Sequence, residues 1–308
     1  MAHRAQGDRR TGPNGDGSTT HDERSLMSLY PTAPIDWNTV IDDPDRAIPF
    51  GVTPDGALLS MDRWTSPHLM VTGGPRTGKT TFLQTHVAMG LVRKEAFIVI
   101  DTESTDSRLE FARPWLHGFA GKSDYEGAAA LCEAVSVEVA RRGDLMVKHK
   151  VTRLTLLPDA VRPPTLTLIV AGVQSLTDRT RRPCRCATHR AEDEAAARIL
   201  GWVGKFSREA RFAGVRVIVS GTVSREAARA VGHVDFARLA LGPITRDDRQ
   251  IALHDPMNSP ELVTAWPGQG VYEAMDLPAE AVHCWSEPGG VDALRAKLVE
   301  LAPLPTGA

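Results

Sequence analysis

Residues 73–80 read Gly73-Gly74-Pro75-Arg76-Thr77-Gly78-Lys79-Thr80. An apolar run at 67–72 precedes them, and sequence typical of a helix follows at 79–93. The spacing fits the phosphate-binding loop G-x-x-x-x-G-K-[ST]. In this loop backbone N–H groups face phosphate oxygens, the lysine adds charge near the β- and γ-phosphates, and the Ser or Thr hydroxyl ligates Mg²⁺. The helix start also favours an anion. We therefore predict an ATP site from Gly73 to Thr81, with Thr80 as a Mg²⁺ ligand. The alternative is a glycine-rich turn without function.

The composition is that of an ordinary globular chain. Of 308 residues, 42% are hydrophobic and 24% charged, and the formal net charge is −2. Any nucleic-acid contact must then come from a local patch. The sequence has neither an apolar run near the roughly 18 residues that span a bilayer nor a secretory signal at residues 1–25. Four cysteines without regular spacing indicate a reducing compartment. We expect a cytoplasmic protein.

Apolar runs and amphipathic segments alternate along most of the chain. Residues 48–62 read as two short strands around the turn-forming triplet Pro54-Asp55-Gly56. Further strands are expected at 67–72, 96–100, 166–170, 215–220, 236–241 and 270–273, and helices at 79–93, 125–148, 191–212 and 291–301. Several of these strands are continuously apolar, which is typical of strands covered on both faces. We predict an α/β fold with a doubly wound, mainly parallel sheet in a single domain, 29–308, after a disordered tail, 1–28.

The acidic residues that hydrolysis requires are difficult to place. A P-loop hydrolase normally holds Mg²⁺ with an Asp that ends a buried strand, and a neighbouring Glu often activates water. Asp101 and Glu103 end one such strand. That strand directly follows the first crossover helix, and in many P-loop motors it lies at the far side of the sheet. The later strand, where the acidic pair is expected, carries Ala171 and Gly172 instead. The sequence predicts nucleotide binding with doubtful hydrolysis, unless Asp101 and Glu103 supply the acids.

The order of these segments resembles the FtsK/SpoIIIE branch of the FtsK/HerA superfamily over about residues 45–275. This branch contains hexameric P-loop ATPases, including DNA pumps and the type VII secretion ATPase EccC. The resemblance rests on the lead-in hairpin and P-loop, 48–85, the second strand, 96–111, a Glu-x-x-Arg-Arg helix at Glu138, Arg141 and Arg142, the stretch 209–222, and the final strand and hairpin, 238–255 with 267–272. It implies a RecA-like P-loop NTPase fold, ATP with Mg²⁺, and assembly into a homo- or hetero-oligomeric ring.

The chain departs from the family's pattern at the residues that perform hydrolysis. Ala171-Gly172 replaces the Asp-Glu pair, and Thr222 stands where active DNA pumps have a phosphate-sensing Gln. The Thr version is similar to EccC's accessory ATPase domains, some of which also lack a full acidic pair. Arg211 matches the family's Arg before the fourth strand and is expected either to serve a neighbouring subunit's nucleotide or to be a surface arginine.

Two further segments carry candidate sites. Residues 178–190 read as a loop rich in arginine (Arg179, Arg181, Arg182, Arg185, Arg190), which either contacts DNA phosphates or is a solvated insertion. Cys184, Cys186 and His189 form a possible metal cluster that lacks a fourth ligand nearby in sequence. His68, before a buried strand, is expected to be structural.

These observations leave two hypotheses of different kinds. The first is an ATP-binding FtsK/SpoIIIE-like domain of a machine that translocates or transfers double-stranded DNA, with a degenerate acidic motif and weak hydrolysis. The second is an EccC-like binding module that hydrolyses ATP poorly and recognises a protein substrate or partner in secretion. A P-loop kinase is less favoured, because no segment reads as a substrate lid.

Overall fold

The computed structural model describes residues 33–42, 47–61, 67–102, 108–183, 186–222, 224–231, 236–243, 245–262, 265–275 and 277–304. The tail expected at 1–28 lies outside the described residues. The strands are β1 Ile48–Val52, β2 Leu58–Met61, β3 His68–Gly73, β4 Ala96–Ile100, β5 Gly118–Ala120, β6 Leu166–Ala171, β7 Val215–Gly221, β8 Phe236–Leu241, β9 Gln269–Glu273 and β10 Glu280–Cys284. The helices are α2 Trp37–Asp42, α3 Lys79–Val92, α4 Tyr125–His149, α5 Val173–Arg181, α6 Ala187–Glu209, α7 Arg225–Ala230, α8 Arg246–Ala252 and α9 Gly290–Leu301. Short 3₁₀ turns are η1 Glu110–Trp115, η2 Leu154–Leu156 and η3 Arg211–Ala213.

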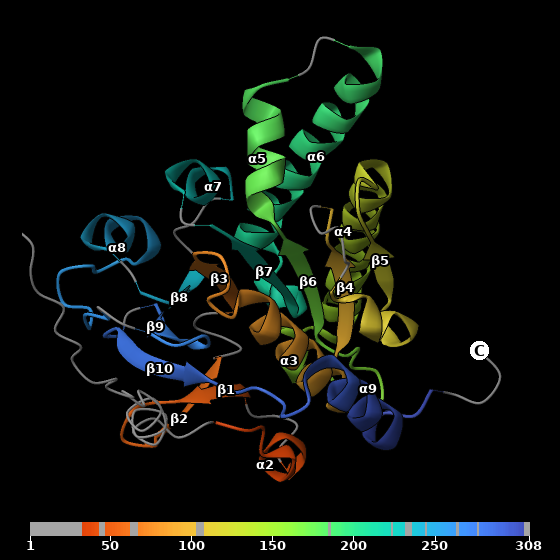
Figure 1. The fold of residues 1–308 in the computed structure, drawn as a ribbon. Helices are drawn as coiled ribbons and strands as arrows, with labels where there is room; N and C mark the ends of the chain where they lie inside the picture. The colour runs from red at the N-terminus through yellow and green to blue at the C-terminus, as the bar shows by residue number, and fades with distance from the viewer. Residues whose placement is uncertain are drawn as a thin grey trace, which may run out of the picture. The chain divides into compact units, whose positions relative to one another are not determined.

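All ten of these strands form one sheet, in the order β2-β1-β10-β9-β8-β3-β7-β6-β4-β5 (Figure 1). From β8 to β5 the strands pair in parallel, and β9, β10, β1 and β2 extend the sheet in antiparallel fashion. Every residue of β3, β6, β7 and β8 is buried. Burial on both faces explains why these strands read as continuous apolar runs in the sequence.

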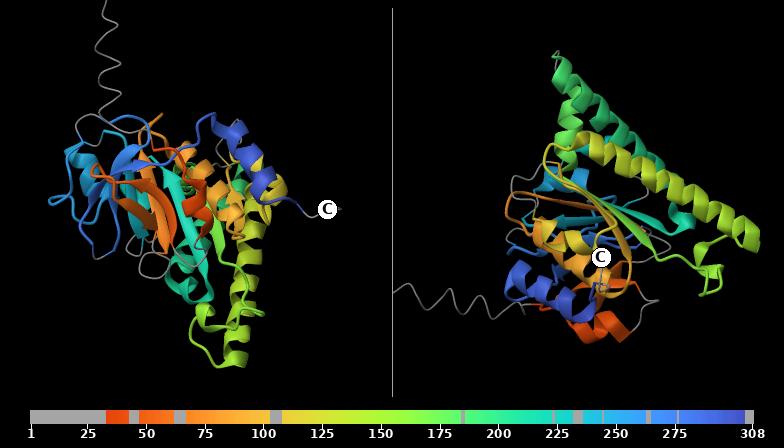
Figure 2. Two further views of the ribbon diagram at one scale, coloured as in Figure 1. Left: turned by 90° about the horizontal axis from the view of Figure 1, so that it is seen from below. Right: turned by 90° about the vertical axis from the view of Figure 1, so that its right-hand side faces the viewer.

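Helices cover both faces of the parallel part of the sheet. Alternate residues of β3 point to opposite faces, so Leu69 and Val71 pack into one apolar cluster and Met70 into another. The first cluster includes residues of α3 and α9, and the second includes residues of α4, α5 and α6. Figure 2 shows these two sets of helices on opposite sides of the sheet. The predicted α/β class with a doubly wound, mainly parallel sheet is confirmed.

The largest secondary-structure error concerns residues 178–190, which we expected to be a loop. Helix α5 continues through Arg181, and α6 begins at Ala187, four residues before the predicted start. The two helices pack side by side (Figure 1). Helices α7 and α8 were also missed, although their N-caps carry a recognisable signal: the side chains of Ser224 and Thr245 accept hydrogen bonds from the first turns. None of the described helices has the length and apolar content that a bilayer crossing requires.

Candidate nucleotide-binding site

The phosphate loop connects the end of β3 to the start of α3. Gly78 has φ 103°, in the left-handed region that favours glycine. A Cβ on Gly78 would lie 2.7 Å from the backbone N of Gly268, so no larger side chain fits there. No side chain caps the first turn of α3, which leaves its backbone N–H groups available to an anion. The second fixed glycine of the motif is thus required by both conformation and space.

Lys79 lies over this loop. Its Nζ donates hydrogen bonds to the carbonyl oxygens of Gly73 at 2.8 Å and Gly74 at 2.6 Å. Thr77 Oγ1 also donates to Gly74 O, at 3.0 Å. Thr80, in the first turn of α3, is half-buried. A cation, a helix N-terminus and a threonine hydroxyl therefore converge at one turn, and this donor set fits a triphosphate with its Mg²⁺.

A distant part of the chain supports the loop from the other side. Gly268, just before β9, donates its N–H to Thr77 O at 2.9 Å. Gly242, just after β8, donates to Gln269 O at 2.8 Å, and a Cβ on Gly242 would lie 2.3 Å from Thr77 Cγ2. Residues 267–272 were expected in a closing hairpin, but their contact with the phosphate loop was not predictable from the sequence.

The strand order decides which carboxylates can approach the loop. Only β7 separates β6 from β3, whereas β4 lies one strand further away. With neighbouring strands about 4.8 Å apart, β6 lies about 10 Å from β3 and β4 about 14 Å. The nearer strand, β6, ends in Ala171, which is buried beside Ser220, and Gly172 follows with φ 70°. On the farther strand, Asp101 is buried directly after β4, and Glu103 lies outside the described residues.

The comparisons with known proteins agree with this geometry. The model of the FtsK/SpoIIIE family matches residues 35–229, more than half of the chain. The chain belongs to the FtsK/SpoIIIE family. Membership in this family implies nucleotide binding. No match was found among the curated proteins.

Solved structures with this fold include transfer and secretion ATPases. The pCW3 conjugation coupling protein TcpA, in monomer form with ATPγS, has a TM-score of 0.70 and 16% identity over 88% of this chain and 74% of its own. The cytoplasmic domain of the Thermomonospora curvata type VII secretion ATPase EccC has a TM-score of 0.64 and 17% identity, over 90% of this chain and 33% of its own. A structure of ATPases 2 and 3 of Thermomonospora curvata EccC, in complex with a signal sequence peptide, has a TM-score of 0.57 and 14% identity, over 83% of this chain and 43% of its own. The chain spans less than half of either EccC chain.

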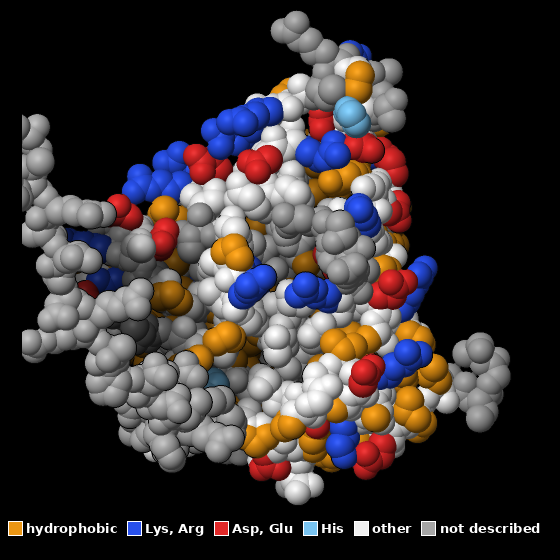
Figure 3. Space-filling view, in the orientation of Figure 1, with side chains coloured by type: hydrophobic (Ala, Val, Ile, Leu, Met, Phe, Trp, Pro, Cys, Tyr) orange, Lys and Arg blue, Asp and Glu red, His pale blue; other side chains and the backbone are white. Residues whose placement is uncertain are grey.

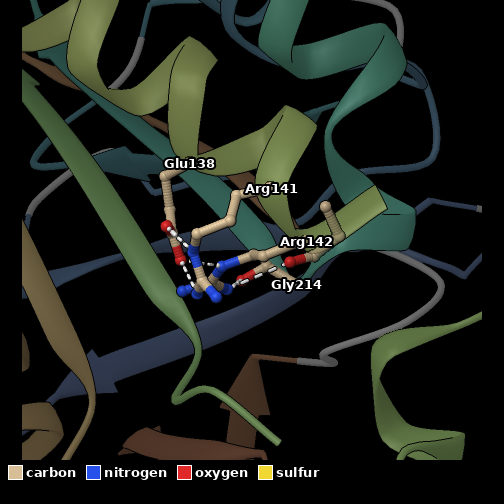
Figure 4. A network of polar contacts seen from close by, with 5 residues as sticks. Glu138, Arg141, Arg142 and Gly214 are labelled. Atoms are coloured by element: carbon tan, nitrogen blue, oxygen red, sulfur yellow. Dashed lines mark hydrogen bonds and ion pairs between the residues drawn. The ribbon is translucent and has the colours of Figure 1, made fainter. Parts of the chain in front are cut away.

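The Glu-x-x-Arg-Arg segment of this FtsK/SpoIIIE domain forms a tight polar network (Figure 4). Glu138 accepts from Arg141 Nε at 2.6 Å and from Arg142 Nε at 2.7 Å. Arg142, which is buried, also donates to the carbonyl oxygen of Ala213 at 3.0 Å. Hydrogen bonds from Arg141 and then Arg142 lower the pKa of Glu138 to about 2. The network therefore ties α4 to the end of η3, the short 3₁₀ turn that begins with Arg211.

Arg211 itself is exposed. It lies at the N-terminal ends of the parallel strands, whereas the phosphate loop lies at their C-terminal ends. It precedes β7, which runs parallel to β3, and its charge acts on His68 at the start of β3. Burial, with the charges of Arg211 and Arg216, lowers the pKa of His68 to about 3, and His68 Nδ1 accepts from Val217 N. The six residues of β3 span about 17 Å. Arg211 thus lies too far away to reach the phosphate loop of its own chain.

Two of the five arginines of the predicted basic loop, Arg179 and Arg181, form ion pairs. Arg179 pairs with Glu192 at 2.7 Å and lies over the ring of Tyr125, and Arg181 pairs with Glu226 at 3.6 Å. In the upper part of Figure 3, where α5, α6 and α7 lie, Lys and Arg side chains alternate with Asp and Glu. Arg182 is exposed, and Arg185 lies outside the described residues.

The possible metal cluster is only partly covered by the structure. Cys186 Sγ lies 3.1 Å from His189 Nδ1. Cys184 lies outside the described residues, within which no group of three His, Cys, Asp or Glu side chains is arranged to hold a metal ion.

Proposed function

We propose that residues 29–308 form an FtsK/SpoIIIE ATPase domain that binds ATP with Mg²⁺, acts on double-stranded DNA as part of a ring, and hydrolyses ATP slowly. The observation that carries this proposal is the phosphate loop from Gly73 to Thr81, with Lys79 held over it. In this account the loop N–H groups and Lys79 hold the phosphates, and Thr80 ligates the metal. Bound Mg²⁺ supplies charge neutralisation at the β- and γ-phosphates.

Slow hydrolysis follows from the end of β6. A water molecule that attacks the γ-phosphate needs a group that orients or deprotonates it, and loss of a general base alone lowers the rate by about 10²- to 10⁴-fold. Ala171 and Gly172 offer no such group, and Thr222, exposed after β7, cannot act as a base at neutral pH. Asp101 is a full strand further from the loop. Binding is therefore retained in this account while turnover is weak.

The ring is supported by the position of Arg211. An exposed arginine at the strand ends opposite the phosphate loop cannot reach a nucleotide bound to its own chain. It can instead neutralise phosphate charge on a nucleotide bound to a neighbouring subunit. The Glu138–Arg142 network holds the turn on which Arg211 lies. Homo- and hetero-oligomeric rings are both compatible with this role.

Double-stranded DNA is the proposed substrate because the fold is shared with a conjugation coupling protein and because Arg182 is exposed on the α5–α6 connection. The alternative is a protein substrate or partner, since the same fold occurs in an EccC fragment that binds a signal sequence peptide. Duplex DNA that raises ATP turnover supports the first function. An ATP turnover rate that duplex DNA does not change, together with binding of a secreted or partner protein, supports the second function.

The test of nucleotide binding is calorimetric titration with ATPγS in the presence of Mg²⁺. Lys79→Ala removes the cation at the phosphates and is expected to weaken binding at least about tenfold, which corresponds to about 1.4 kcal/mol. Lys148→Ala, an exposed lysine on α4, is the matched control and is expected to bind as the wild type does. Equal affinity of wild type and Lys79→Ala would contradict the proposed site.

A further inference from the structure

An exposed tryptophan lies beside the phosphate loop. Trp266, in the turn before β9, has 53% of its surface exposed. An exposed aromatic ring beside a binding loop offers a large, rigid apolar face to a ligand. Trp266 is not part of either apolar cluster that fills the two faces of the sheet. Its place next to the phosphate loop makes Trp266 a candidate contact for the ligand of that loop.

The turn that carries Trp266 is fixed against the loop. Two residues along, Gly268 donates its N–H to Thr77 O, and its backbone lies where a side chain on Gly78 would go. The turn is also closed on itself: Trp266 N donates to Gln269 Oε1 at 2.9 Å, and Gln269 N donates to Trp266 O at 2.9 Å. The backbone of Trp266 is thus held within two residues of a direct contact with the phosphate loop.

The strand order indicates which end of a nucleotide faces this turn. The strands β7 and β6, whose ends meet the γ-phosphate and its attacking water in a P-loop enzyme, lie on one side of β3. The strands β8 and β9 lie on the other side. A triphosphate that runs along the loop with its γ end toward β7 directs its nucleoside end toward β9 and Trp266.

We infer that the indole of Trp266 stacks on the base of the bound nucleotide. This inference rests on the proposed function, because it requires a nucleotide in the phosphate loop. Every nucleobase presents an aromatic face, so stacking favours nucleotides over inorganic polyphosphate and discriminates little between bases. Trp266 is in this account a specificity-determining residue that distinguishes a nucleotide from a bare phosphate chain.

The test compares ATPγS with tripolyphosphate as calorimetric ligands, both with Mg²⁺. Trp266→Ala is expected to weaken ATPγS binding by about five- to 150-fold, the range of measured base–aromatic stacking. Tripolyphosphate, which has no base, is expected to bind wild type and Trp266→Ala within twofold. Trp266→Phe keeps an aromatic face and is expected to retain most of the ATPγS affinity. Leu277→Ala, an exposed apolar residue after β9, is the matched control and is expected to change neither ligand's affinity.

Two other outcomes contradict the stacking inference, and a third contradicts the proposed function. ATPγS affinity unchanged in Trp266→Ala, with Lys79→Ala still defective, overturns the stacking inference and leaves the phosphate site intact. Equal losses for ATPγS and tripolyphosphate also overturn it, because Trp266 then acts by supporting the loop. Failure of the wild type to bind either ligand contradicts the proposed function itself.

Discussion

Arg142 and Arg141 share one carboxylate but differ in burial, and this difference predicts very different effects on stability. Arg142 is 2% exposed, and it bonds both Glu138 and the Ala213 carbonyl. Removing one partner of a buried ion pair costs about 3–5 kcal/mol, and a hydrogen bond from a charged group contributes about 1.5–3 kcal/mol. In Arg142→Met, Glu138 still has its ion pair with Arg141 and is partly exposed to water. We therefore expect this substitution to lower the free energy of unfolding by about 3 kcal/mol, the lower end of the range for buried ion pairs.

In a domain of this size, each kcal/mol lowers the melting temperature by about 2–4 °C, so Arg142→Met should lower it by about 6–12 °C. The assay is thermal unfolding followed by circular dichroism, at a fixed scan rate. Arg141→Met is the matched control: the side chain of Arg141 is 56% exposed, and exposed ion pairs contribute about 0–1 kcal/mol. Equal shifts for the two variants would refute the argument that Arg142 fixes the turn before β7.

Three further predictions concern Glu138, Arg211 and Arg182. The folded pKa of Glu138, about 2, lies below its ordinary value of 4.5, so its contribution to stability is present above pH 4.5 and is lost as the pH falls toward 2. Glu138→Gln should make the free energy of unfolding depend less on pH between pH 4.5 and 2. A pH dependence identical to that of the wild type would contradict the lowered pKa. Arg211→Ala should leave ATPγS affinity within twofold but reduce ATPγS-dependent assembly in sedimentation velocity, and unaltered assembly would refute a role in a neighbouring subunit. Arg182→Ala should lower the salt slope of duplex binding by about 0.9, whereas Arg179→Ala, whose partners are Glu192 and Asp193, should leave it unchanged; identical slopes in all three proteins would remove DNA contact from this segment.

The fold was predictable where local chemistry determines conformation. The glycines and Lys79 of the phosphate loop specify its shape within eight residues, and strands buried on both faces are continuously apolar. Helix α5 was harder to predict because its sequence, VQSLTDRTR, is polar over most of its length, and only two apolar residues, Val173 and Leu176, mark its buried face.

The rest of the candidate site depends on contacts between distant parts of the chain. Gly268 is 191 positions after Thr77, and nothing in either segment alone indicates that they are hydrogen-bonded. The ion pairs of Arg179 and Arg181 likewise depend on how α5 packs against α6 and α7. The sequence alone therefore could not show which of the clustered arginines lie in ion pairs.

The structure also indicates which substitution best introduces an acid at the end of β6. Gly172 has φ 70° and ψ 38°, and a non-glycine residue in this left-handed conformation costs about 1–2 kcal/mol. Gly172→Glu would therefore add strain at the start of α5. Ala171→Asp introduces a carboxylate at the strand end without that strain, so the single substitution is the better variant.

The most direct test of the account is the steady-state rate of ATP turnover per chain, at saturating Mg²⁺ and ATP and with duplex DNA present. We expect slow turnover in the wild type, an increase in Ala171→Asp, and no change in Asp101→Ala, because Asp101 lies on the strand farther from the phosphate loop. Rapid turnover in the wild type that Asp101→Ala abolishes would contradict the account, since β4 would then supply the catalytic acid.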